Sequence, residues 1–253
     1  MPYADSAERR MIPTGYESLD HLLGGLERRN VSLVASRPSV GKSALALNVV
    51  HKITELGYNA LYISLATPKE QLLNRLIASQ TGLMLSKITI GDITQQERET
   101  ILRTATELRR YRFVDAIESQ VETLVQKIQY ENRKQSLDLV VIDGIHRLDR
   151  KMAKWPITQA LQHLKKVAYR TDSHIMMLGS VIERDVEQRN DGQPTLLDLW
   201  RNEDLAIATD VILLLSDKRD QERDALIIEV AQHINGPLGQ VTLFYDKSIQ
   251  RID

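Results

Sequence analysis

The 253-residue sequence contains no cysteine, and it has no long apolar run. Without cysteine the chain cannot form a disulfide framework, a thiolate zinc site or a thiol nucleophile. No apolar run approaches the roughly 20 residues of a membrane span, and the N-terminal segment MPYADSAERRM lacks the apolar core of a signal peptide. We therefore expect a cytoplasmic protein with no membrane partner.

Neither sign of charge is in excess. Lys and Arg total 33 and Asp and Glu total 34, which gives a formal net charge of -1. A protein that coats nucleic acid carries a global basic excess, so any DNA contact must come from a local basic groove. The 42% apolar content is enough to bury a substantial core, and the absence of repeats and of Pro/Gly/Ser linkers favours one domain.

Apolar, β-branched runs alternate with segments of helical apolar spacing. The runs predict strands at Val31 to Ser36, Ala60 to Leu65, Leu137 to Ile142, His174 to Ser180, Asp210 to Leu215, Leu226 to Ala231 and Gln240 to Tyr245. The spacing predicts helices at Lys42 to Leu56, Pro68 to Thr81, Gln95 to Arg110, Val121 to Lys134 and Pro156 to Thr171. This alternation predicts an α/β fold with a doubly wound, mainly parallel sheet. Short turns such as DKRDQERD and NGPLG predict antiparallel strands at its C-terminal edge.

The stretch VASRPSVGKSALALN predicts a phosphate-binding loop between a strand and a helix. Gly41, Lys42 and Ser43 match the end of a P-loop, whereas Ser36 stands where the general pattern has its first glycine. Backbone N–H groups bind phosphate, Lys42 reaches the outer phosphates, and the Ser43 hydroxyl ligates Mg²⁺. We therefore expect ATP or ADP to bind at Ser36, Arg37, Pro38, Ser39, Val40, Gly41, Lys42, Ser43 and Ala44.

A second motif, LDLVVIDG, delivers Asp143 at the carboxyl end of an apolar strand. A Walker B aspartate holds the Mg²⁺ shell from this position. Together the two motifs predict a Mg²⁺ site formed by Ser43 and Asp143.

Six stretches of the chain resemble the C-terminal RecA-like motor domain of the DnaB replicative helicase family. They are IPTGYESLDHLLGGL, SRPSVGKSALALN, YISLATPKEQLLNRLIAS, LDLVVID, VEQRNDGQPTLLDL and INGPLGQVTLFY. The resemblance implies a RecA-like P-loop NTPase domain at residues 12–253 after an N-terminal extension at residues 1–11. It also implies that the family's N-terminal domain and linker helix have no counterpart, so that we expect a motor domain by itself.

The resemblance also implies that the hydrolytic apparatus is replaced. Ala66 in SLATP stands where the family's SLEMP supplies the glutamate that deprotonates the attacking water. Val181 stands at the position of a γ-phosphate-sensing glutamine, and Gln232 and Ile234 stand at those of a lysine and an arginine finger offered to the neighbouring subunit. A lost general base costs 10²- to 10⁴-fold in rate and a lost finger roughly 10³- to 10⁵-fold. We therefore expect weak or absent ATP hydrolysis.

The family's DNA-contacting turn DLRESG corresponds to DLWRNE in this chain. Glu203 repels a phosphate there, whereas Arg201 supplies a positive charge and Trp200 a surface on which a base can stack. The predicted contacts with single-stranded DNA are Arg184, Arg189, Trp200 and Arg201.

Three functions remain open from the sequence. The leading hypothesis is an ATP-binding accessory or regulatory component of DNA replication or helicase assembly, with a helicase or another replication protein as partner. An alternative is an active ATP-dependent DNA helicase or translocase, in which Glu70, Glu183, Arg184 or His233 replaces the lost groups. The other alternative is a nucleotide-gated regulator of the KaiC and RecA type without a DNA role.

Overall fold

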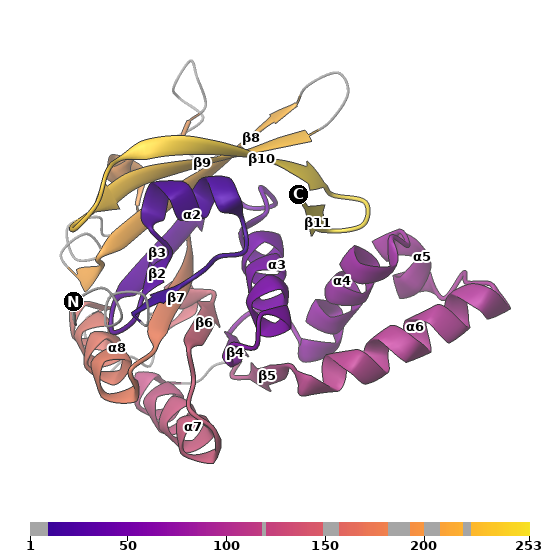
Figure 1. Cartoon of the computed structure of the whole chain (residues 1–253), viewed down its shortest axis with the longest axis horizontal. Helices are drawn as coiled ribbons and strands as arrows, with labels where there is room; N and C mark the ends of the chain where they lie inside the picture. Colours follow the sequence, from indigo (N-terminus) through magenta and orange to yellow (C-terminus); the bar gives the residue numbers. More distant parts are fainter. Residues whose placement is uncertain (1–9, 118–119, 149–156, 182–192, 200–207, 220–223) are drawn as a thin grey trace, which may run out of the picture.

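A nine-stranded sheet forms the centre of the molecule, and helices cover both of its faces (Figure 1). The structure is a computed structural model that describes residues 10–117, 120–148, 157–181, 193–199, 208–219 and 224–253. No helix within these ranges is long and apolar enough to cross a bilayer.

The sheet combines six parallel strands with three antiparallel ones. The parallel strands are β3 (Val31–Ser36), β4 (Ala60–Ser64), β5 (Arg112–Asp115), β6 (Leu139–Asp143), β7 (His174–Ser180) and β8 (Val211–Arg219). The antiparallel strands are β9 (Asp224–His233), β10 (Gly239–Asp246) and β11 (Arg251–Ile252). The order β11-β10-β9-β8-β3-β7-β6-β4-β5 confirms the predicted parallel sheet with an antiparallel edge.

The remaining elements surround this sheet. A small separate ladder pairs β1 (Met11–Ile12) with β2 (Leu26–Glu27). The α-helices are α2 (Glu17–Leu23), α3 (Lys42–Glu55), α4 (Lys69–Thr81), α5 (Leu85–Ile90), α6 (Gln95–Glu107), α7 (Val121–Lys134) and α8 (Ile157–Thr171). Short 3₁₀ turns are η1 (Leu108–Arg110), η2 (Ile145–Arg147) and η3 (Leu196–Asp198). The predicted turn DKRDQERD was too long, because β8 continues to Arg219 and β9 begins at Asp224.

The two faces of the sheet bury separate apolar clusters. Along β3, Val34 belongs to the cluster beneath α3 and α4, whereas Leu33 and Ala35 belong to the cluster beneath α7 and α8. Side chains alternate between the faces of a strand, so a strand covered on both sides must be apolar throughout. This burial explains the continuous apolar runs of the parallel strands.

His174, the first residue of β7, is buried within this core. Its Nδ1 donates to the backbone carbonyl oxygen of Glu27 at 2.8 Å, because a carbonyl oxygen only accepts. Its Nε2 lies 2.8 Å from Oγ of Ser32 and accepts that hydroxyl proton. Burial lowers the pKa of His174 from 6.5 to about 4.

Acid is therefore expected to destabilise the fold through His174. Between pH 6.5 and pH 4 the unfolded state binds the imidazole proton while the folded state does not. Stability that is fully present above pH 6.5 is lost by about 1.4 kcal/mol per pH unit as the pH falls towards 4. Urea unfolding at pH 7.5 and pH 5 should show a smaller pH dependence for His174→Gln than for the unchanged protein. An equal pH dependence in both proteins would contradict this assignment.

Candidate nucleotide-binding site

The predicted phosphate loop joins the carboxyl end of β3 to the start of α3. The buried side chain of Val40 attaches this loop to the core. Two residues have positive φ, Ser39 at 63° and Gly41 at 134°. A side chain at Gly41 would lie 3.0 Å from Cε1 of Tyr245, so glycine is required both for the backbone conformation and for this close contact.

Lys42 carries a positive charge at the end of the loop. Its Nζ donates to the backbone oxygens of Ser36 and Arg37 at 3.1 and 3.0 Å and to Oγ of Ser36 at 2.9 Å. Burial lowers the pKa of Lys42 from 10.5 to about 8, although the negative charge of Asp143 opposes this shift. The ammonium group thus lies inside the loop, where phosphate oxygens can replace its present acceptors.

The amino end of α3 fits an anion. Gly41 caps this helix and has no side chain, so the N-cap residue offers no side-chain acceptor to the first N–H groups of α3. Free N–H groups at a helix N-terminus and a neighbouring lysine form a cradle for phosphate. The residues of the predicted P-loop therefore fit the phosphates of a nucleotide.

Asp143 ends β6 beside the loop. Its Oδ2 accepts a hydrogen bond from Oγ of Ser43 at 2.7 Å, and its side chain is buried. Carboxylate and hydroxyl oxygens are hard ligands of the kind that Mg²⁺ takes in phosphate sites, together with substrate phosphates and water. The structure thus brings together the two residues predicted to hold Mg²⁺ from positions 100 residues apart.

Tyr62 on β4 is a member of the site that sequence reasoning missed. Its hydroxyl also donates to Oδ2 of Asp143, at 2.7 Å, and its ring packs against Phe113 with 5.6 Å between centroids. Burial, followed by the negative charge of Asp143, raises the pKa of Tyr62 well above 10. The hydroxyl is therefore protonated at neutral pH and acts as a donor.

Arg75 on α4 is the second residue that sequence reasoning missed. Burial raises the pKa of both Tyr62 and Tyr245, and the positive charge of Arg75 opposes this rise at each of them. Burial raises the pKa of Tyr245 more than Arg75 lowers it. A sequence signal was present, because Arg75 shares the buried face of α4 with Leu72 and Leu76.

Ala66 and Val181, two of the four positions predicted to have lost a hydrolytic group, lie beside Asp143 or the loop. A side chain built at Gly144 would meet Cβ of Ala66 at 3.3 Å, so the Ala66 methyl lies next to the residue that follows Asp143. Val181 follows β7, is buried, and donates its backbone N–H to the carbonyl oxygen of Ser36 at 3.2 Å. Neither an alanine nor a valine side chain can accept or donate a proton at these places.

The other two of these positions, Gln232 and Ile234, lie at the opposite end of the strands from the loop. Gln232 pairs with Ile212 near the amino end of β8, and its Nε2 donates to the carbonyl oxygen of Thr209 at 2.8 Å. Ile234 is 59% exposed and donates its backbone N–H to Asp210. The register puts Ile234 about five residues, or roughly 16 Å along the strands, from the level of the P-loop. These two residues therefore lie at the end of the strands away from the predicted P-loop of their own chain.

Two of the residues considered above as displaced hydrolytic groups, Glu70 and His233, lie in the described part of the chain. Glu70 is exposed in the first turn of α4, and His233 ends β9 at the edge opposite the loop. The remaining predicted residues, which include all the DNA contacts, lie outside the described part of the chain: Glu183, Arg184, Arg189, Trp200 and Arg201.

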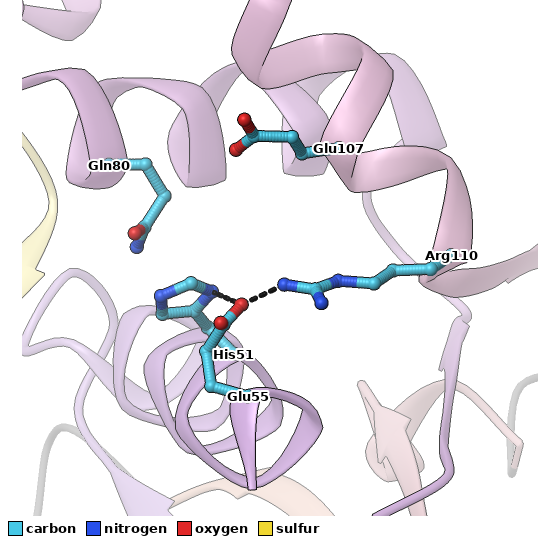
Figure 2. Close-up of a pocket in the computed structure, with 5 residues that line it drawn as sticks. All are labelled: His51, Glu55, Gln80, Glu107 and Arg110. Carbon is cyan, nitrogen blue, oxygen red and sulfur yellow. Dashed lines mark hydrogen bonds and ion pairs between the residues drawn. The ribbon is translucent and has the colours of Figure 1, made fainter. Parts of the chain in front are cut away.

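A separate polar cavity of about 540 Å³ lies near the carboxyl end of α3 (Figure 2). Its walls are His51 and Glu55 from α3, Gln80 from α4, and Glu107 and Arg110. Arg110 donates to Glu55, and burial, helped by the charge of Arg110, lowers the pKa of His51 to about 4. His51 is nine residues beyond the start of α3, roughly 14 Å from the P-loop, so this cavity is not the phosphate site.

Comparison with known proteins agrees with this fold. A family model described as "DnaB-like helicase C terminal domain" matches residues 11–253. Replicative DNA helicase DnaC of Bacillus subtilis (strain 168) is 24% identical, over 95% of this chain and 56% of that protein. Replicative DNA helicase DnaB of Geobacillus stearothermophilus is 25% identical with the same coverage. The chain thus spans about half the length of these curated relatives.

Two solved structures share the whole fold. One, described as an "ATPase Domain", has a TM-score of 0.88 and 26% identity, covering 99% of this chain and 94% of that chain. The other, "The Structure Of A DnaB-Like Replicative Helicase And Its Interactions With Primase", has a TM-score of 0.86 and 27% identity, covering 95% of this chain and 62% of that one. The family model and both structures cover nearly all of the present chain, which therefore belongs to the DnaB-like helicase C-terminal domain family.

Proposed function

We propose that this chain binds ATP or ADP with Mg²⁺ and hydrolyses ATP slowly or not at all. One observation carries the proposal. Lys42, Ser43 and Asp143 are assembled for binding, whereas the methyl group of Ala66 lies beside Gly144, where the resemblance puts the general base. A site of this composition retains the groups that hold phosphate and metal and lacks the group that deprotonates water.

The biological role that we propose is that of an accessory or regulatory component in DNA replication or helicase assembly. The replicative helicases among its relatives support this role. The partner to test first is a replicative helicase, and primase is the next, because one related helicase structure was determined for its interactions with primase. Single-stranded DNA is a weaker candidate partner.

A second candidate function is an active ATPase motor, and Arg75 is the observation that favours it. The positive charge of Arg75 opposes the rise in pKa that burial causes at Tyr62 and Tyr245 in the same chain. A cation held in cis can stabilise charge that develops during phosphoryl transfer. In this alternative Glu70 or Glu183 supplies the missing base.

The unchanged protein distinguishes the two candidates. Calorimetry with ATP and ADP, with and without Mg²⁺, should show nucleotide binding. Phosphate release should stay below about 0.1 per second with or without single-stranded DNA, because ordinary turnover numbers are reduced by the loss of a base. Several turnovers per second would contradict the proposal. If Glu70→Gln abolished such activity while Glu99→Gln, a change at an exposed position of α6, did not, the active motor would replace it.

A further inference from the structure

Tyr62 donates a hydrogen bond to the carboxylate of Asp143 from β4, a strand that is not part of the P-loop. Its hydroxyl and that of Ser43 converge on the same atom, Oδ2 of Asp143, each at 2.7 Å. Among the described residues, no hydrogen bond is assigned to the other carboxylate oxygen of Asp143, Oδ1. The two donors thus fix one oxygen and leave the other available to a metal ion or to its water shell.

The two donors differ in how firmly they are held. Ser43 lies in the first turn of α3, directly after the phosphate loop. Tyr62 lies within β4, where it pairs with Val141 of β6, and its side chain is completely buried against Phe113. Because the sheet holds Tyr62 in place, its hydroxyl keeps the carboxylate of Asp143 in one orientation without depending on the loop. Hydrogen bonds of this kind orient metal ligands and support their affinity.

We propose that Tyr62 is a positioning residue that holds Asp143 for Mg²⁺, so that its hydroxyl sets the Mg²⁺ dependence of nucleotide binding. This inference rests on the proposed function, because it assumes that a nucleotide occupies the P-loop. Asp143 is only 6% exposed, so water replaces a lost hydroxyl donor poorly. The phosphate contacts of Lys42 and of the loop amides do not pass through Tyr62, and they should be independent of it.

Tyr62→Phe separates these two contributions because it removes only the hydroxyl. The Mg²⁺ concentration that gives half-maximal binding of fluorescent ADP should rise about 10- to 100-fold. Binding of the same ADP in EDTA should change by less than about 2-fold, because it depends on Lys42 and the loop. A purely structural role would instead weaken both measurements equally, or neither.

Tyr111→Phe is the matched control. Its hydroxyl lies 2.7 Å from Nδ1 of His51, away from the P-loop, so the variant loses a contact of the same length without touching Asp143. The Mg²⁺ dependence of Tyr111→Phe should equal that of the unchanged protein. In an Asp143→Asn background, Tyr62→Phe should cause no further change in Mg²⁺ dependence.

A second measurement keeps the Tyr62 hydroxyl, so that the inference can still be tested if Tyr62→Phe does not fold. With 3-fluorotyrosine placed at position 62, the ¹⁹F signal should move when Mg²⁺ is added to the ADP complex and remain in place when ADP is added in EDTA. If the Mg²⁺ concentration for half-maximal ADP binding were unchanged in Tyr62→Phe, or if the ¹⁹F signal did not respond to Mg²⁺, the inference about Tyr62 would be overturned. The proposed nucleotide binding would not be affected by either result. Absence of nucleotide binding by the unchanged protein overturns the proposed function as well.

Discussion

Lys42→Ala is expected to weaken the binding of ATP and ADP by about 100-fold or more. Nζ of Lys42 now donates to three oxygen acceptors of its own loop, at 2.9 to 3.1 Å. When a nucleotide binds, we expect its phosphate oxygens to take over these donors, and two charge-assisted hydrogen bonds of about 1.5 kcal/mol each account for the stated loss. Alanine keeps the helix but removes the ammonium group from the cradle. Calorimetric titration with Mg-ADP measures the effect.

Lys52→Ala is the control, because it makes the same substitution later in α3. Nζ of Lys52 lies over the ring of Tyr16, 4.6 Å from its centroid, and does not contact the loop. Its nucleotide affinity should match that of the unchanged protein. If Lys42→Ala bound nucleotide with full affinity, the phosphates would have to bind elsewhere in the molecule.

The parallel sheet and the loop between β3 and α3 could be predicted because their signals are local in sequence. Strands covered on both faces must be apolar throughout, and β3 and β7 have the predicted bounds. The position of Asp143 at the end of β6 follows from the same pattern, because its carboxylate ends an otherwise apolar strand. Gly-Lys-Ser between a strand and a helix is likewise a contiguous signal.

The support around Asp143 could not be predicted because it depends on contacts between distant segments. Tyr62 lies 81 residues before Asp143 and is one apolar residue among several in β4. Only the pairing of β4 with β6 brings its hydroxyl to the carboxylate. Arg75 is similar, because its place near Tyr62 depends on how α4 packs on the sheet.

Short elements were also missed, for a different reason. β5 has four residues and α5 has six, so neither offers enough repeats to establish a period. β5 extends the parallel sheet by pairing with β4, and this pairing decides its conformation. Helix α6 ends at Glu107 and continues as the 3₁₀ turn η1, so the helix predicted to end at Arg110 was three residues too long.

Restoring the lost groups is expected to raise ATP turnover by at least about 100-fold. The variant combines Ala66→Glu, Val181→Gln, Gln232→Lys and Ile234→Arg. Ala66 lies beside Gly144, so a glutamate there supplies a base next to the metal site, and Ile234→Arg supplies a finger from an exposed position. A base contributes 10² to 10⁴ and a finger 10³ to 10⁵, and imperfect geometry accounts for the lower expected gain. Phosphate release measures the turnover of the restored variant.

The position of Ile234 makes a sharper test possible. Because Ile234 lies roughly 16 Å along the strands from its own P-loop, its replacement can serve only the nucleotide of another subunit. Two half-restored chains, one with Ala66→Glu and Val181→Gln and the other with Gln232→Lys and Ile234→Arg, should each remain slow. Their mixture should become active, and its specific activity should rise with total protein concentration.

Two control variants complete this experiment. Val181 is buried and pairs with Leu199, so glutamine at position 181 could disturb the fold. A variant that carries the other three substitutions and keeps Val181 tests this. A variant with Ala66→Gln in place of Ala66→Glu keeps the side-chain shape without the base, and it should stay slow because charge neutralisation alone does not deprotonate water.

If the mixed half-restored chains stayed inactive while the fully restored chain was active at every concentration, Ile234→Arg would be acting within its own chain. If no restored variant exceeded the unchanged protein although light scattering showed paired subunits, Ala66 and Ile234 would not occupy hydrolytic positions.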